Sequence, residues 1–199
     1  MNICIFGDSI TWGAGDSQKG GWVERFKIYF NKKYDYDIMT YNLSINGNTT
    51  ENLLVRIKNE SEVRKPNIIV FAIGINDAQF IYSTNRNHIS DNSFKNNIEK
   101  LYETAKKFTP KIIFIGLTSV DETKTKSILW NTNISYTNER IKNFDKIIKN
   151  FCIKNNLKFI SVNNLLKNSD LADGLHPNTQ GHIKMFKKIK SEIEFAVKE

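Results

Sequence analysis

Short apolar runs alternate with stripes of apolar residues along the chain. Five of the runs are nearly continuous in Ile, Val and Phe, and they occupy residues 2–6, 37–42, 67–73, 111–117 and 158–162. Apolar runs of this length without polar alternation are typical of strands that are covered on both faces, as in a parallel sheet. The pattern therefore predicts five buried parallel strands.

Between the runs, apolar residues recur at the spacing of a helix. The helical stripes are Trp22, Phe26, Tyr29 and Phe30; Leu54 and Ile57; Phe94, Ile98, Leu101, Tyr102, Ala105 and Phe108; Ile141, Phe144, Ile148 and Phe151; and Phe186, Ile189 and Ile193. Each stripe predicts a helix with one face on the core, and Ser93 is the predicted N-cap of the third helix. We interpret the aromatic residues of the stripes as core residues and not as a cofactor site.

Strands that alternate with helices predict an α/β fold. We expect residues 1–199 to form a single domain with three layers (α/β/α), a five-stranded parallel sheet in flavodoxin-like order and right-handed crossovers. Two segments, residues 78–92 and 118–133, fit no element. Both follow the carboxyl ends of predicted strands, where ligands bind in such folds, so we expect both to wall a binding crevice.

Composition narrows the class of protein. Hydrophobic residues make up 40% and charged residues 25% of the chain, as in globular proteins. The net charge is +8, but the lysines are scattered and no nucleic-acid-binding signature is present, so we expect no nucleic-acid partner. No segment resembles a signal peptide or a membrane span, which predicts a cytoplasmic protein without stable membrane insertion. Cys4 and Cys152 are predicted to be buried structural thiols, and no Cys/His spacing indicates a metal site.

Four small polar motifs carry the candidate chemistry. Three of them follow the first, second and third predicted strands, and the fourth precedes the last helix. They are Gly7-Asp8-Ser9, Asn46-Gly47-Asn48-Thr49-Thr50, Gly74-Ile75-Asn76-Asp77 and Asp173-Gly174-Leu175-His176-Pro177. Each motif alone is also typical of a turn. In the predicted fold, however, the first three converge on one crevice, and the fourth can close over it.

These motifs contain the groups that acyl transfer needs. Serine is a weak nucleophile unless a base removes its proton, and His176 is the best candidate base for Ser9. Asp173, three residues before His176, can hold the far ring nitrogen of the histidine. The backbone N–H groups of Ser9 and Gly47 and the side-chain amide of Asn76 can donate hydrogen bonds to an oxyanion.

Other candidate residues have weaker support. His88 and His182 are expected at the surface or at a helix cap, and either could act as the base only if His176 were misplaced. Trp12 and Trp130 can line a substrate pocket, but packing at the rim of the crevice explains them equally well.

The motif residues are also similar to those of a known family. Gly7-Asp8-Ser9, Gly47, the segment at 74–77 and the segment at 173–177 resemble the signature of the GDSL-type esterases and lipases, also called SGNH hydrolases. The resemblance implies a flavodoxin-like fold, no metal or organic cofactor, and hydrolysis through a covalent acyl-serine. It also implies that Ser9 is the nucleophile, that His176 is the base, and that Asp173 orients the base. The implied oxyanion donors are Ser9, Gly47 and Asn76.

We therefore expect a serine hydrolase that acts on a small-molecule carboxylic ester, namely a short-chain acyl or acetyl ester, a carbohydrate ester or a lysophospholipid. The alternative is a binding module, either a catalytically inactive SGNH-like protein or a flavodoxin-like carrier. The chain has no Gly-x-Gly-x-x-Gly motif and no Walker sequence, which argues against a nucleotide carrier. A Gly-x-Ser-x-Gly elbow is also absent, which argues against an α/β-hydrolase. The sequence leaves the oligomeric state open.

Overall fold

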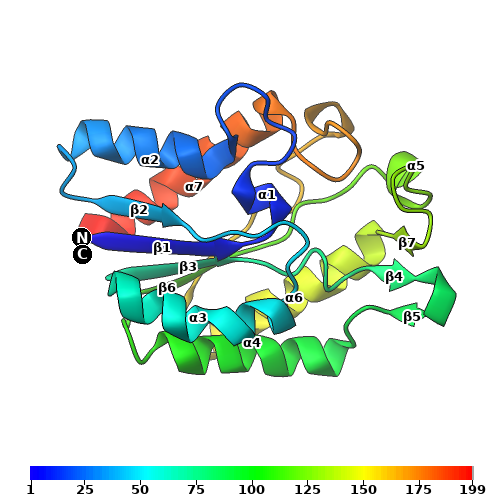
Figure 1. Cartoon of the computed structure of the whole chain (residues 1–199), viewed down its shortest axis with the longest axis horizontal. Helices are drawn as coiled ribbons and strands as arrows, with labels where there is room; N and C mark the ends of the chain where they lie inside the picture. The colour runs from blue at the N-terminus through cyan, green and yellow to red at the C-terminus, as the bar shows by residue number, and fades with distance from the viewer. Residues whose placement is uncertain (199) are drawn as a thin grey trace.

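A parallel five-stranded sheet forms the central layer of the computed structural model, which describes residues 1–198 (Figure 1). Its strands are β1 (Asn2–Gly7), β2 (Met39–Asn42), β3 (Ile68–Ala72), β6 (Ile112–Ile115) and β8 (Lys158–Ile160). The order β2-β1-β3-β6-β8 confirms the flavodoxin-like arrangement. Ile73 and Leu117 lie beyond the paired ends of their strands and are still buried. For this reason the apolar runs are longer than the strands.

Helices cover both faces of the sheet, which confirms the three predicted layers. One face carries α2 (Gly21–Lys33) and α7 (Thr179–Lys198), and the other carries α3 (Thr50–Arg64), α4 (Asp91–Ala105) and α6 (Asn138–Lys154) (Figure 1). The prediction of Ser93 as an N-cap is wrong. Ser90 caps α4, because its backbone is extended and its hydroxyl accepts a hydrogen bond from the Ser93 N–H at 3.1 Å.

A row of three phenylalanines crosses the centre of the sheet. Phe6 on β1, Phe71 on β3 and Phe114 on β6 are register partners, and all three are buried. The ring centroids of Phe6 and Phe71 lie 6.0 Å apart, and those of Phe71 and Phe114 lie 4.9 Å apart. Aromatic cross-strand pairs stabilise neighbouring strands. The row therefore fixes the register of β1, which leads into Ser9, against β3, which leads into Asn76.

The two segments for which the sequence predicted no element contain short regular structure. Residues 78–92 hold β4 (Phe80–Ile81), the 3-10 turn η1 (Tyr82–Thr84) and β5 (Arg86–Asn87), and residues 118–133 hold α5 (Glu122–Thr125) and lead into β7 (Ile134–Ser135). The three strands form an antiparallel sheet in the order β5-β4-β7, which projects beyond the carboxyl ends of the main strands (Figure 1). Strands of two residues are too short to produce an alternating pattern, which explains why the sequence did not reveal them.

Cys4 and Cys152 are free and buried, as predicted, and burial raises the pKa of each thiol to about 12. None of the described helices has both the length and the apolar character that crossing a membrane requires. The described chain contains no group of three or more His, Cys, Asp or Glu residues that could hold a metal ion.

Replacing Phe71 by alanine should lower the free energy of unfolding by about 3–5 kcal/mol, because the change leaves a cavity between the rings of two other strands. Urea unfolding measures this difference. Val55→Ala is the matched control, because Val55 on α3 is 83% exposed and its replacement should change the free energy by at most about 0.5 kcal/mol. Equal effects of the two replacements would show that the phenylalanine row is not a main source of stability.

Candidate active site

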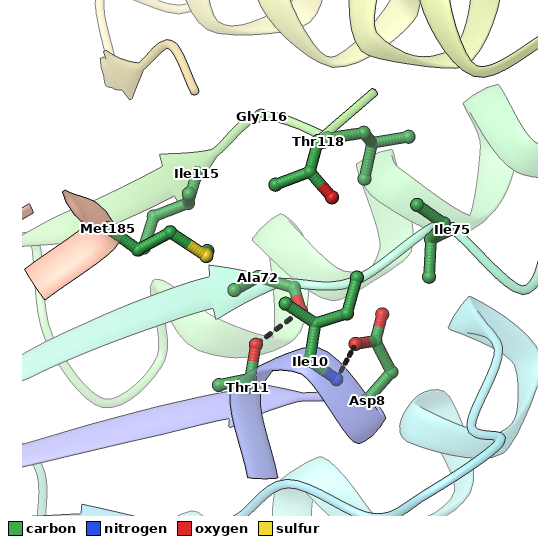
Figure 2. A pocket seen from close by; sticks show the side chains of 10 residues that line it. Asp8, Ile10, Thr11, Ala72, Ile75, Ile115, Gly116, Thr118 and Met185 are labelled. Carbon is green, nitrogen blue, oxygen red and sulfur yellow. Dashed lines mark hydrogen bonds between the residues drawn. The ribbon is translucent and has the colours of Figure 1, made fainter. Parts of the chain in front are cut away.

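Ser9 lies at the carboxyl end of β1, where the chain turns into the four-residue helix α1 (Ser9–Trp12). The Asp8 carboxylate caps this helix by accepting a hydrogen bond from the Ile10 N–H at 3.0 Å. The Thr11 hydroxyl donates a hydrogen bond to the Ala72 carbonyl, at the end of β3, at 3.2 Å. Figure 2 shows both hydrogen bonds on the inner side of α1. The first bond caps the helix, and the second holds it against the sheet.

The turn into α1 requires glycine at position 7. A Cβ atom on Gly7 would lie 2.7 Å from the carbonyl oxygen of Ala72 and would overlap the side chain of Thr11. Any larger residue would therefore separate β1 from β3 or displace α1. The glycine of the Gly-Asp-Ser motif thus acts through packing, because it allows the close approach that places Ser9.

Ser9, His176 and Asp173 form one chain of hydrogen bonds. The Oγ atom of Ser9 lies 2.9 Å from Nε2 of His176, and Nδ1 of His176 lies 2.7 Å from Oδ2 of Asp173. A neutral imidazole with its proton on Nδ1 donates to the carboxylate and accepts the serine hydroxyl proton at Nε2. The three residues that the sequence predicted to act together are therefore in contact.

The Asp173 carboxylate also shapes the turn that carries His176. Its Oδ1 atom accepts hydrogen bonds from the backbone N–H groups of Leu175 at 2.9 Å and of His176 at 2.8 Å. Burial opposes the ionisation of Asp173, but the hydrogen bonds from the ring and the backbone of His176 outweigh it and hold the pKa of this carboxyl below its ordinary value. One carboxylate therefore fixes both the ring and the main chain of His176.

Gly47 and Asn76 line a cavity of about 390 Å³ that also contains Ser9 and His176. Gly47 has a φ of +76°, and a Cβ atom on it would meet nothing within 4 Å. The left-handed backbone, and not crowding, therefore favours glycine at this position. The Nδ2 group of Asn76 donates one hydrogen bond to the Asn48 carbonyl at 3.0 Å, which leaves its second N–H for a ligand.

Two polar residues at this cavity were missed by the sequence analysis. Tyr136, which directly follows β7, is 1% exposed, and Gln79 precedes β4. Both side chains donate a hydrogen bond to the Asn76 side chain. Neither residue belongs to a recognisable motif. Their only signal in the sequence was their place within or next to the two segments that fit no element.

Those two segments contribute unequally to the described wall of the cavity. Residues 118–133 supply Trp130 and Asn131, whereas residues 78–92 supply Gln79. Trp12, the other tryptophan considered for the pocket, is 53% exposed and lines a separate hollow. Residues 118–133 therefore make the larger contribution to this wall.

The other two histidines are not part of the described cavity wall. His182 is fully buried, and its Nε2–H donates to the Ala14 carbonyl at 2.9 Å, so the expectation of a surface or capping role is wrong. The reason is its spacing, because residues 182, 186, 189 and 193 share one face of α7. Burial lowers the pKa of His182 below its ordinary value. His88 is exposed, and its Nδ1–H donates to the Asn76 backbone carbonyl at 3.1 Å.

Two buried carboxyl groups lie next to the site residues in the chain. Asp8 is 2% exposed, and burial raises its pKa to about 7 against the opposing effect of the Ile10 N–H. Asp77 accepts a hydrogen bond from the Thr50 backbone N–H at 3.1 Å, and burial raises its pKa to about 6. The Asp77 contact ties the loop that carries Asn76 to the start of α3.

Solved structures of other proteins have the same fold over almost the whole chain. A lipase/acylhydrolase from Enterococcus faecalis is 25% identical, has a TM-score of 0.78, and matches over 98% of this chain and 96% of that one. A GDSL-like lipase from Bacteroides thetaiotaomicron is 24% identical, with a TM-score of 0.71 and coverages of 98% and 88%. A variant of an acetyl xylan esterase from Geobacillus stearothermophilus is 20% identical, with a TM-score of 0.76 and coverages of 96% and 94%.

Residues 5–183 match the model of the GDSL-like lipase/acylhydrolase family. This range includes all four motifs, from Gly7 to Pro177. The chain therefore belongs to this family, as its motifs indicated, and the protein is an enzyme of the lipase and acylhydrolase class. A comparison with curated proteins found no match.

Replacing Asp8 by asparagine should change how stability depends on pH. A carboxyl whose pKa rises on folding, here from 3.8 to about 7, binds its proton more tightly in the folded chain. Its contribution to the free energy of unfolding is therefore lost as the pH rises towards the folded pKa. Asparagine can keep the cap on Ile10 but does not titrate. The stability of Asp8→Asn relative to the wild type should increase between about pH 4 and about pH 7 and level off above this range.

Urea unfolding of both proteins across this pH range measures the difference. Asp91→Asn, a change at an exposed carboxyl in the first turn of α4, is the control. A difference between Asp8→Asn and wild type that stays constant with pH would mean that Asp8 does not titrate in this range.

Proposed function

We propose that the protein hydrolyses carboxylic esters through a covalent acyl intermediate on Ser9. The observation that carries the proposal is the hydrogen-bond chain from Ser9 through His176 to Asp173 at the wall of a cavity. Membership of the lipase/acylhydrolase family supports the same class of reaction. In this proposal Ser9 is the nucleophile, His176 is the general base and acid, and Asp173 orients His176.

In the acylation step, Oγ of Ser9 attacks the ester carbonyl carbon while Nε2 of His176 takes the hydroxyl proton. The carbonyl electrons move onto oxygen and produce a tetrahedral oxyanion. The Asp173 carboxylate, 2.7 Å from Nδ1, stabilises the imidazolium that forms. The bond to the alcohol oxygen then breaks, the alcohol leaves with the proton from His176, and the acyl group stays on Ser9.

In the deacylation step, water attacks the acyl carbonyl carbon and gives its proton to Nε2 of His176. A second tetrahedral oxyanion forms and collapses. The bond between the carbonyl carbon and Oγ of Ser9 breaks, and Oγ takes the proton back from His176. The products are the carboxylic acid and the free enzyme.

We assign the oxyanion to three N–H donors, the backbone groups of Ser9 and Gly47 and the Nδ2 group of Asn76. The Gly47 N–H donates no backbone hydrogen bond within the described chain, so it is available to a ligand. Donors that are fixed before the reaction need no reorganisation when charge develops on the oxygen. Loss of one such donor typically lowers kcat about 10²- to 10³-fold.

We further propose that the substrate is a short-chain acyl ester, such as an acetyl ester, of a polar alcohol such as a carbohydrate. Amide side chains of Asn46 and Asn131 line the cavity and can exchange hydrogen bonds with hydroxyl groups. Trp130, which is 57% exposed, offers an apolar face at the same wall. The likeness in fold to an acetyl xylan esterase agrees with this substrate class.

Hydrolysis of p-nitrophenyl acetate tests the roles of the three residues. Ser9→Ala should lower kcat by about 10⁵-fold or more, because it removes the nucleophile. Asp173→Asn should lower kcat by about 10⁴-fold, because an amide N–H facing Nδ1 favours the wrong tautomer of His176. Ser17→Ala, a change at an exposed serine in the loop after α1, is the control and should leave kcat unchanged. Equal rates for wild type and Ser9→Ala would refute the serine mechanism.

A panel of esters tests the substrate class. Acetylated sugars should be hydrolysed with a higher kcat/KM than p-nitrophenyl esters of long fatty acids, and lysophospholipids should be poor substrates. Ser9→Ala serves as the blank for every ester. A preference for long acyl chains would overturn the assignment of a polar alcohol and a short acyl group. Binding of the sugar esters without turnover would favour the inactive binding module.

A further inference from the structure

The Asn76 side-chain amide is held on both of its sides. On one side its Nδ2 group donates to the Asn48 carbonyl at 3.0 Å. On the other side its Oδ1 atom accepts hydrogen bonds from the Tyr136 hydroxyl at 2.9 Å and from Nε2 of Gln79 at 3.2 Å. A flipped amide would place oxygen against the Asn48 carbonyl and N–H groups against the donors of Tyr136 and Gln79. Only one orientation of the amide therefore satisfies all three contacts.

The direction of the bond from Tyr136 follows from its own partners. Nε2 of Gln79 has no acceptor function and donates to the Tyr136 hydroxyl oxygen at 2.6 Å. The hydroxyl must then use its single proton elsewhere, and Oδ1 of Asn76 is the acceptor in reach. Burial raises the pKa of Tyr136 above its ordinary value, so the hydroxyl keeps this proton at neutral pH.

Tyr136 itself is fixed by its backbone. Its N–H donates to the Thr125 carbonyl at 3.0 Å, and its carbonyl accepts a hydrogen bond from the Thr125 hydroxyl at 3.0 Å. Thr125 lies at the end of α5 and is 1% exposed. These two bonds connect the small antiparallel sheet and α5 to the hydroxyl that faces Asn76. Such support from a second layer of residues keeps a site group in its working geometry.

We propose that Tyr136 and Gln79 are positioning residues that orient the Asn76 amide so that its free N–H points to the oxyanion. This inference rests on the proposed function, because it requires that Asn76 donates to an oxyanion. It gives the small sheet β5-β4-β7 a role in the reaction besides forming the wall of the cavity. The effect of Tyr136 must therefore pass through Asn76.

A double-mutant cycle with p-nitrophenyl acetate tests this dependence. Tyr136→Phe keeps the buried ring and removes only the hydroxyl. In the wild-type background it should lower kcat by about three- to tenfold, the typical effect of one hydrogen bond, with KM within about twofold. Asn76→Ala should lower kcat by about 10²- to 10³-fold. In the Asn76→Ala background, Tyr136→Phe should cause no further loss of kcat, because the group that it positions is gone.

Gln79→Met provides a second arm with a different side chain, and it should show the same dependence on Asn76. Tyr82→Phe is the matched control. The Tyr82 hydroxyl donates to the Lys126 carbonyl at 3.1 Å, between the same two segments but away from Asn76. Its removal should leave kcat unchanged.

An equal loss of kcat from Tyr136→Phe in both backgrounds would overturn the proposal, because Tyr136 would then act independently of Asn76. An effect on KM alone would also overturn it, because Tyr136 would then affect substrate binding and not the stabilisation of the oxyanion. An unchanged kcat in Tyr136→Phe or in Asn76→Ala would overturn it as well. Ser9→Ala separates this failure from failure of the proposed function. If Ser9→Ala is inactive and the cycle is additive, the positioning role alone is wrong. If Ser9→Ala keeps wild-type activity, the serine mechanism itself is wrong.

Discussion

The hydrogen bond between Ser9 and His176 joins residues that lie 167 positions apart, and the rest of the site depends on how the fold brings these two segments together. Asp16, in the loop after α1, pairs with Arg25 on α2 and accepts a hydrogen bond from the Thr179 hydroxyl at 2.8 Å. Thr179 begins α7 and follows His176 by three residues. The buried carboxylate is tolerated because donors surround it. It therefore fastens the His176 loop to the loop that follows Ser9.

The oxyanion side of the site is assembled by a similar use of buried polar groups. Asp77 holds the Thr50 N–H at the start of α3, and Asn76 holds the Asn48 carbonyl two residues earlier in that segment. Together these contacts fix the loop of Gly47 against the loop of Asn76. Burial raises the pKa of Asp77 to about 6, so this carboxyl is ionised near neutral pH at a cost in stability, which builds up as the pH rises from its ordinary pKa towards the folded value. Sites that need fixed donors commonly carry such local costs.

The sequence predicted the sheet order and the contact of Ser9, His176 and Asp173, because continuous apolar runs and short motifs are local signals. Features that depend on tertiary contacts could not be predicted from the sequence in this way. Tyr136 is positioned by β7, the strand directly before it, and a strand of two residues is too short for an apolar pattern to predict. The prediction of a surface or capping role for His182 was wrong, because its polar residue type favours the surface whereas its position on the inner face of α7 is buried. In each case packing against distant residues, and not the local sequence, decides the environment of the side chain.

Covalent trapping tests the role of Ser9 most directly. A fluorophosphonate reacts with activated serines, and mass spectrometry of the digested protein identifies the modified residue. We predict one adduct, on Ser9, in the wild type, no adduct in Ser9→Ala, and much slower labelling in Asp173→Asn, in which His176 adopts the wrong tautomer. A folded wild-type protein that gives no adduct on Ser9, or one that is labelled at another serine with retained dependence on Asp173, would contradict the assignment of Ser9 as the nucleophile.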